Sequence, residues 1–257
     1  MARLLDDASL QYLVNTSYAA LAVPITMSCF IYIDTFFTST NDRHRFMRLE
    51  DTTGAYGYNF EVLSTADIVP KSIFCNHYDG SHAAAQTTTG IASINTWNHV
   101  AAVFASNSSR SPYLNGGSKD TSTEAQNTVT SDKIFIGQGL GSGYTSGRIA
   151  DVAIWNAALT DTEIAILALG YSPLTIRPQS LVSYWPLIGR TSPEIDLVGG
   201  YGLTLVNAPT AAAHPRIIYP SNMQSGLTIS AAVAGAIMPQ FQYANLGASL
   251  YNGTLIG

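Results

Sequence analysis

Short apolar segments separated by turn residues recur along most of this chain. Residues 25–37 (ITMSCFIYIDTFF) form a nearly continuous apolar run, as burial on both faces requires of a strand. Residues 43–51 and 57–64 alternate between apolar and polar positions, which predicts one wetter face in each strand. Other segments that predict strands are 71–80, 83–93, 96–104, 111–119 and 131–139, with a first strand inside residues 1–24. The pattern is typical of an all-β protein.

Residues 147–170 (GRIADVAIWNAALTDTEIAILALG) combine a strand, a corner and one short helix. Residues 147–155 alternate and are rich in Ile, Val and Trp, which is typical of a strand packed on both faces. Thr160 and Glu163 have the spacing of a capping box, in which each side chain satisfies an amide at the start of a helix. Gly170 follows the last apolar residue and is expected to end that helix.

Four phrases occur in a fixed order over about seventy residues: W-N-H-V-A, Y-L-N-G, I-F-I-G and G-x-I-A-D-V-A-I-W-N-x-A-L-T-x-x-E-I. Together they resemble the laminin-G-like, concanavalin-A-like jelly rolls. Residues 171–209 contain a Y-W-P-L strand and a G-L-T-L strand, and they resemble the closing part of bacteriophage-type members of that group. The resemblance covers roughly residues 8–212. It implies a fold more firmly than an activity, because such sandwiches host lectins, hydrolases and structural proteins.

The expected fold is an all-β antiparallel β-sandwich, a concanavalin-A-like jelly roll with one short helix and an apolar C-terminal tail. A length of 257 residues fits one such sandwich and an appendage. We predict a laminin-G-like jelly-roll domain at 1–212 and, at 213–257, an extended arm for anchoring or oligomerisation. Trp97, Trp155 and Trp185 occupy family-like strand positions, and we expect all three to pack in the core.

Charge is scarce in this sequence. Charged residues make up 11% of the chain, against about 25% in typical soluble domains. After Arg216 no charged residue follows, and the remaining tail is apolar and punctuated by glycine. An exposed tail of this kind would aggregate, so we expect it to be covered by its own sandwich or by another subunit. The net charge of −5 argues against nucleic-acid binding, and no apolar run is long enough to span a membrane.

The leading functional hypothesis is a non-enzymatic virion structural protein of a bacteriophage. It rests on the phage-type closing segment, the low charge, the uncharged tail and an N-terminus without the apolar run of a secretion signal. The jelly roll would be displayed on the particle surface, as a capsid decoration or tail-associated protein anchored through its C-terminal arm. The expected partners are other copies of the chain and virion proteins such as the capsid. The expected location is the virion, assembled in the host cytoplasm.

The first alternative is a lectin-like, carbohydrate-binding adhesin. Sugar binding requires aromatic platforms beside amide or carboxylate groups. The best local cluster for such a site lies near a predicted strand end and consists of Asn76, His77, Tyr78 and Asp79. These four are our candidate ligand-binding residues, with surface glycans as the partner.

The second alternative is a glycoside hydrolase. One hydrolase family with this fold carries E-x-D-x-x-E on a strand, so that alternate carboxylates face the cleft. Glu194 and Asp196 begin that pattern, but Gly199 stands at its third position and the segment reads as a loop. We interpret the match as accidental and predict no enzymatic activity and no catalytic residue.

Neither a metal nor a disulfide is firmly indicated. Laminin-G-like domains often hold calcium at the sandwich rim, and the resemblance makes Asp79, Asp120 and Asp132 the calcium candidates. Each of the three sits in a turn-like context with no dense acidic cluster, so we expect ordinary turn residues and no cofactor. Cys29 and Cys75 lie in apolar strands and are expected to be buried free thiols, although the sequence leaves a disulfide open.

Overall fold

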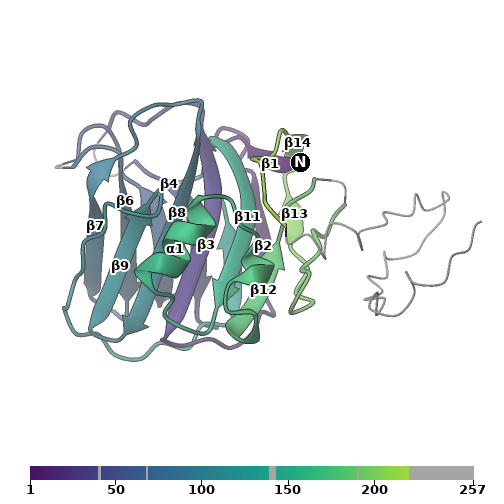
Figure 1. Cartoon of the computed structure of the whole chain (residues 1–257). Coiled ribbons are helices and arrows are strands. Elements are labelled where there is room, and N and C mark those ends of the chain that lie inside the picture. Colours follow the sequence, from purple (N-terminus) through teal and green to yellow (C-terminus); the bar gives the residue numbers. More distant parts are fainter. Residues whose placement is uncertain (40–41, 68, 139–142, 190, 220–257) are drawn as a thin grey trace, which may run out of the picture. The chain divides into compact units, whose positions relative to one another are not determined.

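Two antiparallel sheets make up the part of the chain that the computed structural model describes, residues 1–39, 42–67, 69–138, 143–189 and 191–219 (Figure 1). Sheet A has the strand order β14 (Thr210–Ala212), β1 (Ala2–Leu5), β11 (Gly147–Trp155), β3 (Ile25–Ile33), β8 (Trp97–Ser106), β9 (Ser109–Leu114), and β12 (Leu181–Trp185) also pairs with β11. Sheet B has the order β13 (Thr204–Val206), β2 (Tyr12–Asn15), β10 (Lys133–Ile136), β4 (His44–Glu50), β5 (Gly57–Val62), β6 (Ser72–Tyr78), β7 (His82–Gly90). The predicted all-β antiparallel sandwich is confirmed.

The inner faces of the two sheets share one hydrophobic core, because successive side chains of a strand point to opposite faces. Met27 and Ile31 of β3 are fully buried there, together with Phe46 of β4 from the other sheet. Cys29 and Cys75 lie in the same core as free thiols, so the expectation of buried free cysteines is confirmed. Burial raises the pKa of the Cys75 thiol to about 12, which leaves it protonated and unreactive at neutral pH.

Helix α1 (Asp161–Ala168) covers part of the outer face of sheet A (Figure 1). Its Ile164 and Leu167 pack in a second apolar cluster with Trp155 of β11. The indole Nε1 of Trp155 donates to the Ile176 carbonyl at 2.8 Å, so this buried ring keeps its hydrogen bond. Ile176 lies between two 3-10 turns, η1 (Pro173–Thr175) and η2 (Pro178–Ser180), which lead into β12.

The predicted ends of the helix are confirmed. The Thr160 hydroxyl accepts from the Glu163 amide at 3.3 Å, and the Glu163 carboxylate accepts from the Thr160 amide at 2.7 Å. This is a complete capping box, which satisfies two amides that the helix itself leaves without partners. Gly170 has a φ of 89°, and its amide donates to the Leu167 carbonyl at 2.9 Å. A residue with a side chain would be strained in that conformation, so glycine ends the helix here.

The prediction that all three tryptophans are core residues is wrong for Trp97. Trp155 and Trp185 are fully buried, whereas Trp97 is half-buried on the outer face of sheet A. Its register partner there is Tyr32, and the two ring centroids are 5.6 Å apart. The helix packs on a later part of β8, beginning at Ala101, so it leaves the first residue of that strand partly exposed.

The faces of β4 and β5 that we expected to contact solvent carry polar side chains, but ion pairs leave the charged ones almost inaccessible to water. Glu61 is 1% exposed, because its two carboxylate oxygens accept from Arg43 and Arg45, each at 2.6 Å. Arg48 and Glu50 form another pair at 2.6 Å and are 8% and 6% exposed. Opposite charges on neighbouring positions therefore shield one another from water, which alternation of residue type alone does not reveal.

The last strand of the described chain is β14, which pairs with β1. The sequence pattern did not predict this strand. One compact unit comprises Met1–Ile217. Residues 220–257, which hold most of the predicted C-terminal arm, lie outside the described residues, so the proposed division into 1–212 and 213–257 stays a prediction. None of the helices in the described ranges has the length and apolarity needed to cross a bilayer.

Candidate functional site

The outer face of sheet B carries two adjacent rows of polar and aromatic side chains, on the opposite side of the sandwich from α1. Strand register places five residues of the first row opposite one another, namely Lys133, Glu50, Gly57, Tyr78 and His82. The second row lies two residues further along each strand and consists of Phe135, Arg48, Asn59, Asn76 and Ala84. Rows two residues apart share one face of a sheet, so these side chains form a continuous surface.

The four predicted ligand-binding residues do not all lie on this surface, because successive side chains of β6 point to opposite faces of the sheet. Asn76 and Tyr78 are on the outer face, whereas His77 between them points into the core and is fully buried. The His77 ring lies 4.5 Å from that of Tyr58, and burial lowers its pKa to about 4, with nearby Arg110 adding to the effect. A neutral imidazole inside the sandwich cannot contact a surface ligand, so His77 has a packing role.

Three side chains form what we call the aromatic patch: Tyr56, Tyr78 and His82. The rings of Tyr78 and His82 are stacked with centroids 4.4 Å apart, and the Tyr56 ring is 6.0 Å from that of Tyr78. Tyr56 is 41% exposed. Gly57 stands directly opposite Tyr78, and a Cβ there would lie 2.0 Å from the Leu49 carbonyl. The position opposite Tyr78 therefore has to lack a side chain.

Sequence reasoning missed Tyr56 and His82 as site residues, although a local signal was present for His82. A three-residue loop, Asp79, Gly80 and Ser81, joins β6 and β7, and the residues that flank a hairpin loop face each other. Tyr78 and His82 are such a pair, so the turn alone could have predicted their contact. Tyr56 precedes β5 and required the pairing of β5 with β6, which is a longer-range fact.

Hydrogen-bonding groups lie beside the aromatic patch. Asn76 is 5% exposed, its amide nitrogen is 3.0 Å from His82 Nδ1, and its Oδ1 has no hydrogen-bond partner. One strand further, Asn59 lies between Asn76 and Arg48. The Arg48 guanidinium stacks over Phe135 at 4.4 Å from the ring centroid. These side chains of sheet B bring together amide, guanidinium and aromatic groups, which are the donors, acceptors and stacking surfaces that a hydroxylated ligand requires.

Asp79, in the β6–β7 turn, instead forms hydrogen bonds to the loop that contains Asn127. Its Oδ2 accepts from the Asn127 amide at 2.7 Å and from the Asn127 side chain at 2.6 Å, and its Oδ1 accepts from the Ser81 amide at 3.2 Å. These donors lower the pKa of Asp79 to about 2. Asp120 and Asp132 lie elsewhere in the chain, and the described residues contain no cluster of three His, Cys, Asp or Glu side chains suited to a metal. The calcium candidates thus stay as sequence predictions.

The two carboxylates that begin the glycosidase-like pattern are occupied by structural partners. Glu194 is 1% exposed and accepts from Arg3 Nε at 2.5 Å. Asp196 is 7% exposed and accepts from the backbone amides of Tyr184 at 2.9 Å and Val198 at 3.0 Å. Both side chains hold the closing segment against the sandwich, and neither belongs to the outer face of sheet B.

Comparison with known proteins supports the fold. A family model described as the concanavalin A-like lectin/glucanases superfamily matches residues 8–165, more than half of the chain. No curated protein matches the sequence. Among solved structures, a proposed carbohydrate-binding protein from Bacteroides ovatus is 19% identical with a TM-score of 0.55, over 82% of this chain and 61% of that one. At this identity the likeness shows the fold alone.

Two further solved structures have weaker likeness to the chain. One is a heptameric pentraxin from Limulus polyphemus, at 15% identity and a TM-score of 0.49, over 64% of this chain and 78% of that one. The other is a domain of an extracellular arabinanase from Geobacillus stearothermophilus, solved with arabinotriose, at 16% identity and a TM-score of 0.46, over 58% of this chain and 68% of that one.

Proposed function

Because the chain belongs to the concanavalin A-like lectin/glucanase superfamily, we propose that it is a non-enzymatic carbohydrate-binding protein whose glycan lies on the outer face of sheet B. The observation that carries this proposal is the aromatic patch beside Asn76 on a face that α1 does not cover. The description of the B. ovatus structure as a proposed carbohydrate-binding protein is in keeping with it.

The binding mechanism follows from the chemistry of the patch. One face of a pyranose ring presents C–H groups, and these stack on aromatic rings such as those of Tyr56 and Tyr78. The sugar hydroxyls around the ring edge then require donors and acceptors in fixed positions. Asn59 and Asn76 supply side-chain amides on neighbouring strands, and Asn59 is the more exposed of the two. Binding by stacking and neutral hydrogen bonds needs no catalytic step.

A glycan array followed by calorimetry on the strongest hit tests this proposal. We expect at least one glycan to bind saturably, and we expect Tyr78→Ala and Tyr56→Ala to weaken that binding by about fivefold each, since stacking contacts contribute about 1 kcal/mol. Tyr171 is the matched control, because it is 42% exposed against 41% for Tyr56 and follows α1 near sheet A. Tyr171→Ala should leave the affinity unchanged.

Two results would overturn the proposal. One is an array without any saturable hit. The other is an equal loss of affinity in Tyr171→Ala and Tyr78→Ala, which would mean that any exposed tyrosine matters equally. Thermal unfolding of each variant separates loss of binding from loss of the fold, since Tyr78 is half-buried.

A second candidate function is display of this binding domain on a bacteriophage particle. The observation that favours it is the low charge of the chain together with the absence of any charged residue after Arg216. Deleting residues 218–257 keeps the whole compact unit Met1–Ile217. If those residues are an anchoring arm, the truncated chain folds and binds glycan but no longer assembles with copies of itself or with virion proteins. Unchanged assembly would refute the anchoring role.

A further inference from the structure

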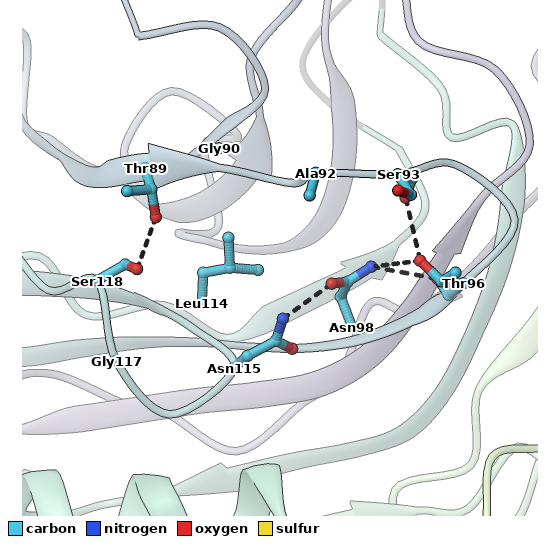
Figure 2. A pocket seen from close by; sticks show the side chains of 10 residues that line it. All are labelled: Thr89, Gly90, Ala92, Ser93, Thr96, Asn98, Leu114, Asn115, Gly117 and Ser118. Atoms are coloured by element: carbon cyan, nitrogen blue, oxygen red, sulfur yellow. Dashed lines mark hydrogen bonds between the residues drawn. The ribbon is translucent and has the colours of Figure 1, made fainter.

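A pocket of about 450 Å³ lies at the opposite end of β7 from the aromatic patch (Figure 2). It is formed where β7 ends, where the loop leads into β8, and where the chain turns after β9. Ten residues line it: Thr89, Gly90, Ala92, Ser93, Thr96, Asn98, Leu114, Asn115, Gly117 and Ser118. The volume is within the range of sites that hold small organic ligands, about 300–1,000 Å³.

The lining of this pocket is polar but carries no charged side chain. Figure 2 shows Leu114 between two groups of polar side chains, with Thr89 and Ser118 on one side and Ser93 and Thr96 on the other. The side chains of Asn98 and Asn115 lie along a third side. Hydroxyl and amide groups therefore surround a small apolar floor.

The polar groups are held in place by one another. The Thr89 and Ser118 hydroxyls are 2.6 Å apart, and Asn115 Nδ2 donates to Asn98 Oδ1 at 2.9 Å. Asn115 Oδ1 accepts from the His99 amide at 2.9 Å, so the Asn115 side chain is fixed at both ends. An amide nitrogen has two protons and a hydroxyl has two lone pairs, so Asn115, Thr89 and Ser118 retain hydrogen-bonding capacity that these contacts do not use.

This lining discriminates between classes of ligand. An ion would enter a pocket with no opposite charge to replace its hydration, which is costly. A wholly apolar ligand would cover the amides and hydroxyls without replacing their hydrogen bonds to water. A neutral ligand with many hydroxyls meets neither penalty, because each hydroxyl both donates and accepts.

From these observations we infer that the pocket is a second glycan-binding site, which holds one neutral monosaccharide unit independently of the aromatic patch. Strand β7 runs from His82 in the patch to Gly90 in the pocket. Eight residue steps at about 3.3 Å place the two sites roughly 26 Å apart along the strand. A monosaccharide cannot span that separation, so the two sites bind short ligands separately. The pocket does not rest on the proposed function, because it could bind when the patch does not.

The test is a two-dimensional proton–nitrogen NMR titration of the full chain with glucose, galactose, mannose and N-acetylglucosamine, and with glucuronate as the charged probe. We expect at least one neutral sugar to shift the amides of Gly90, Ser93 and Gly117 saturably, with a Kd in the millimolar range, about 1–10 mM. Glucuronate should bind at least about tenfold more weakly, because nothing in the lining pairs with its carboxylate.

Two variants and two controls complete the design. Ala92→Trp fills the pocket and should abolish the shifts, and Thr89→Val removes one hydroxyl at nearly constant shape and should weaken binding about fivefold. Ala8→Trp and Thr16→Val are exposed matched controls that precede and follow β2, far from β7 in the strand order of sheet B, and should bind as the parent does.

The outcomes separate the pocket from the patch. Tyr78→Ala should leave the pocket shifts unchanged, and Ala92→Trp should leave array binding at the patch unchanged. The inference is overturned if no neutral sugar shifts these amides saturably, if glucuronate binds as tightly as the neutral sugars, or if Tyr78→Ala removes the pocket shifts. A failure of the patch alone, with pocket shifts intact, would overturn the proposed function and not this site.

Discussion

Replacement of Asp151 by asparagine should change how the stability of this protein depends on pH. Asp151 occupies an irregular position of β11 with a φ of 49°, and its carboxylate is inside the protein, with the residue 2% exposed. The Tyr184 hydroxyl donates to one carboxylate oxygen, and His214 Nε2 lies 3.2 Å from the other. Burial raises the pKa of Asp151 to about 6 from an ordinary value of 3.8, despite the opposing effects of His214 and Tyr184.

The sign and size of the effect follow from linkage. Between pH 3.8 and about 6 the unfolded chain has lost this proton while the folded protein still holds it, so stability falls as pH rises through that window. Each pKa unit corresponds to about 1.36 kcal/mol, so above pH 6 the raised pKa of Asp151 lowers the free energy of unfolding of the parent protein by about 3 kcal/mol. Asparagine cannot ionise and can still accept from Tyr184. The free energy of unfolding of Asp151→Asn minus that of the parent should therefore increase by about 3 kcal/mol between about pH 4 and 7.

Urea denaturation followed by tryptophan fluorescence between about pH 4 and 8 measures this difference. The difference is the useful quantity, because the buried His44, His77 and His99 have pKa values lowered to about 4, 4 and 3. Those histidines destabilise both proteins equally on acidification and cancel in the subtraction. Repeating the comparison in a His214→Gln background removes the neighbouring imidazole. A difference that stays flat with pH in both backgrounds would refute the buried, proton-holding carboxylate.

Three further predictions concern stability, each measured by urea denaturation. Thr160→Ala should cost about 1 kcal/mol by removing half of the capping box, while Thr160→Ser should retain most of it; equal losses would contradict the capping role. Glu194→Gln should cost about 3–5 kcal/mol because it leaves the Arg3 guanidinium buried without its counter-charge, and a neutral effect would show that the ion pair is not structural. Gly57→Ala should prevent folding, since its Cβ would lie 2.0 Å from a backbone oxygen, whereas Gly117→Ala meets no atom within 4 Å and should change stability by less than about 0.5 kcal/mol. Soluble, folded Gly57→Ala would contradict this close approach of the strands.

The candidate site shows where reasoning from sequence stops. Residues 76–79 were recognisable as a cluster of polar and aromatic types at a strand end, and Asn76 and Tyr78 do lie on one outer face. The direction of His77 required knowing which face of β6 meets the core, which depends on the pairing of β6 with β5. Tyr56 joined the patch only through that same pairing, because it is 22 residues away from Tyr78 in the chain. The pocket likewise combines residues 89–98 with residues 114–118, which no local pattern connects.

The sequence by itself determined the local elements, namely the strand pattern, the capped helix at Thr160, the glycine that ends it and the turn at Asp79-Gly80. These depend on periodicity, on short-range hydrogen bonds and on backbone conformations that few residues tolerate, all of which operate between near neighbours. Only the tertiary structure decided which polar positions are exposed. Glu61 is hidden by two arginines and Trp97 is left half-exposed by the extent of α1, while Tyr56 and Tyr78 face outward together. Exposure is a property of what packs against a residue, and in a sandwich those neighbours come from distant parts of the chain.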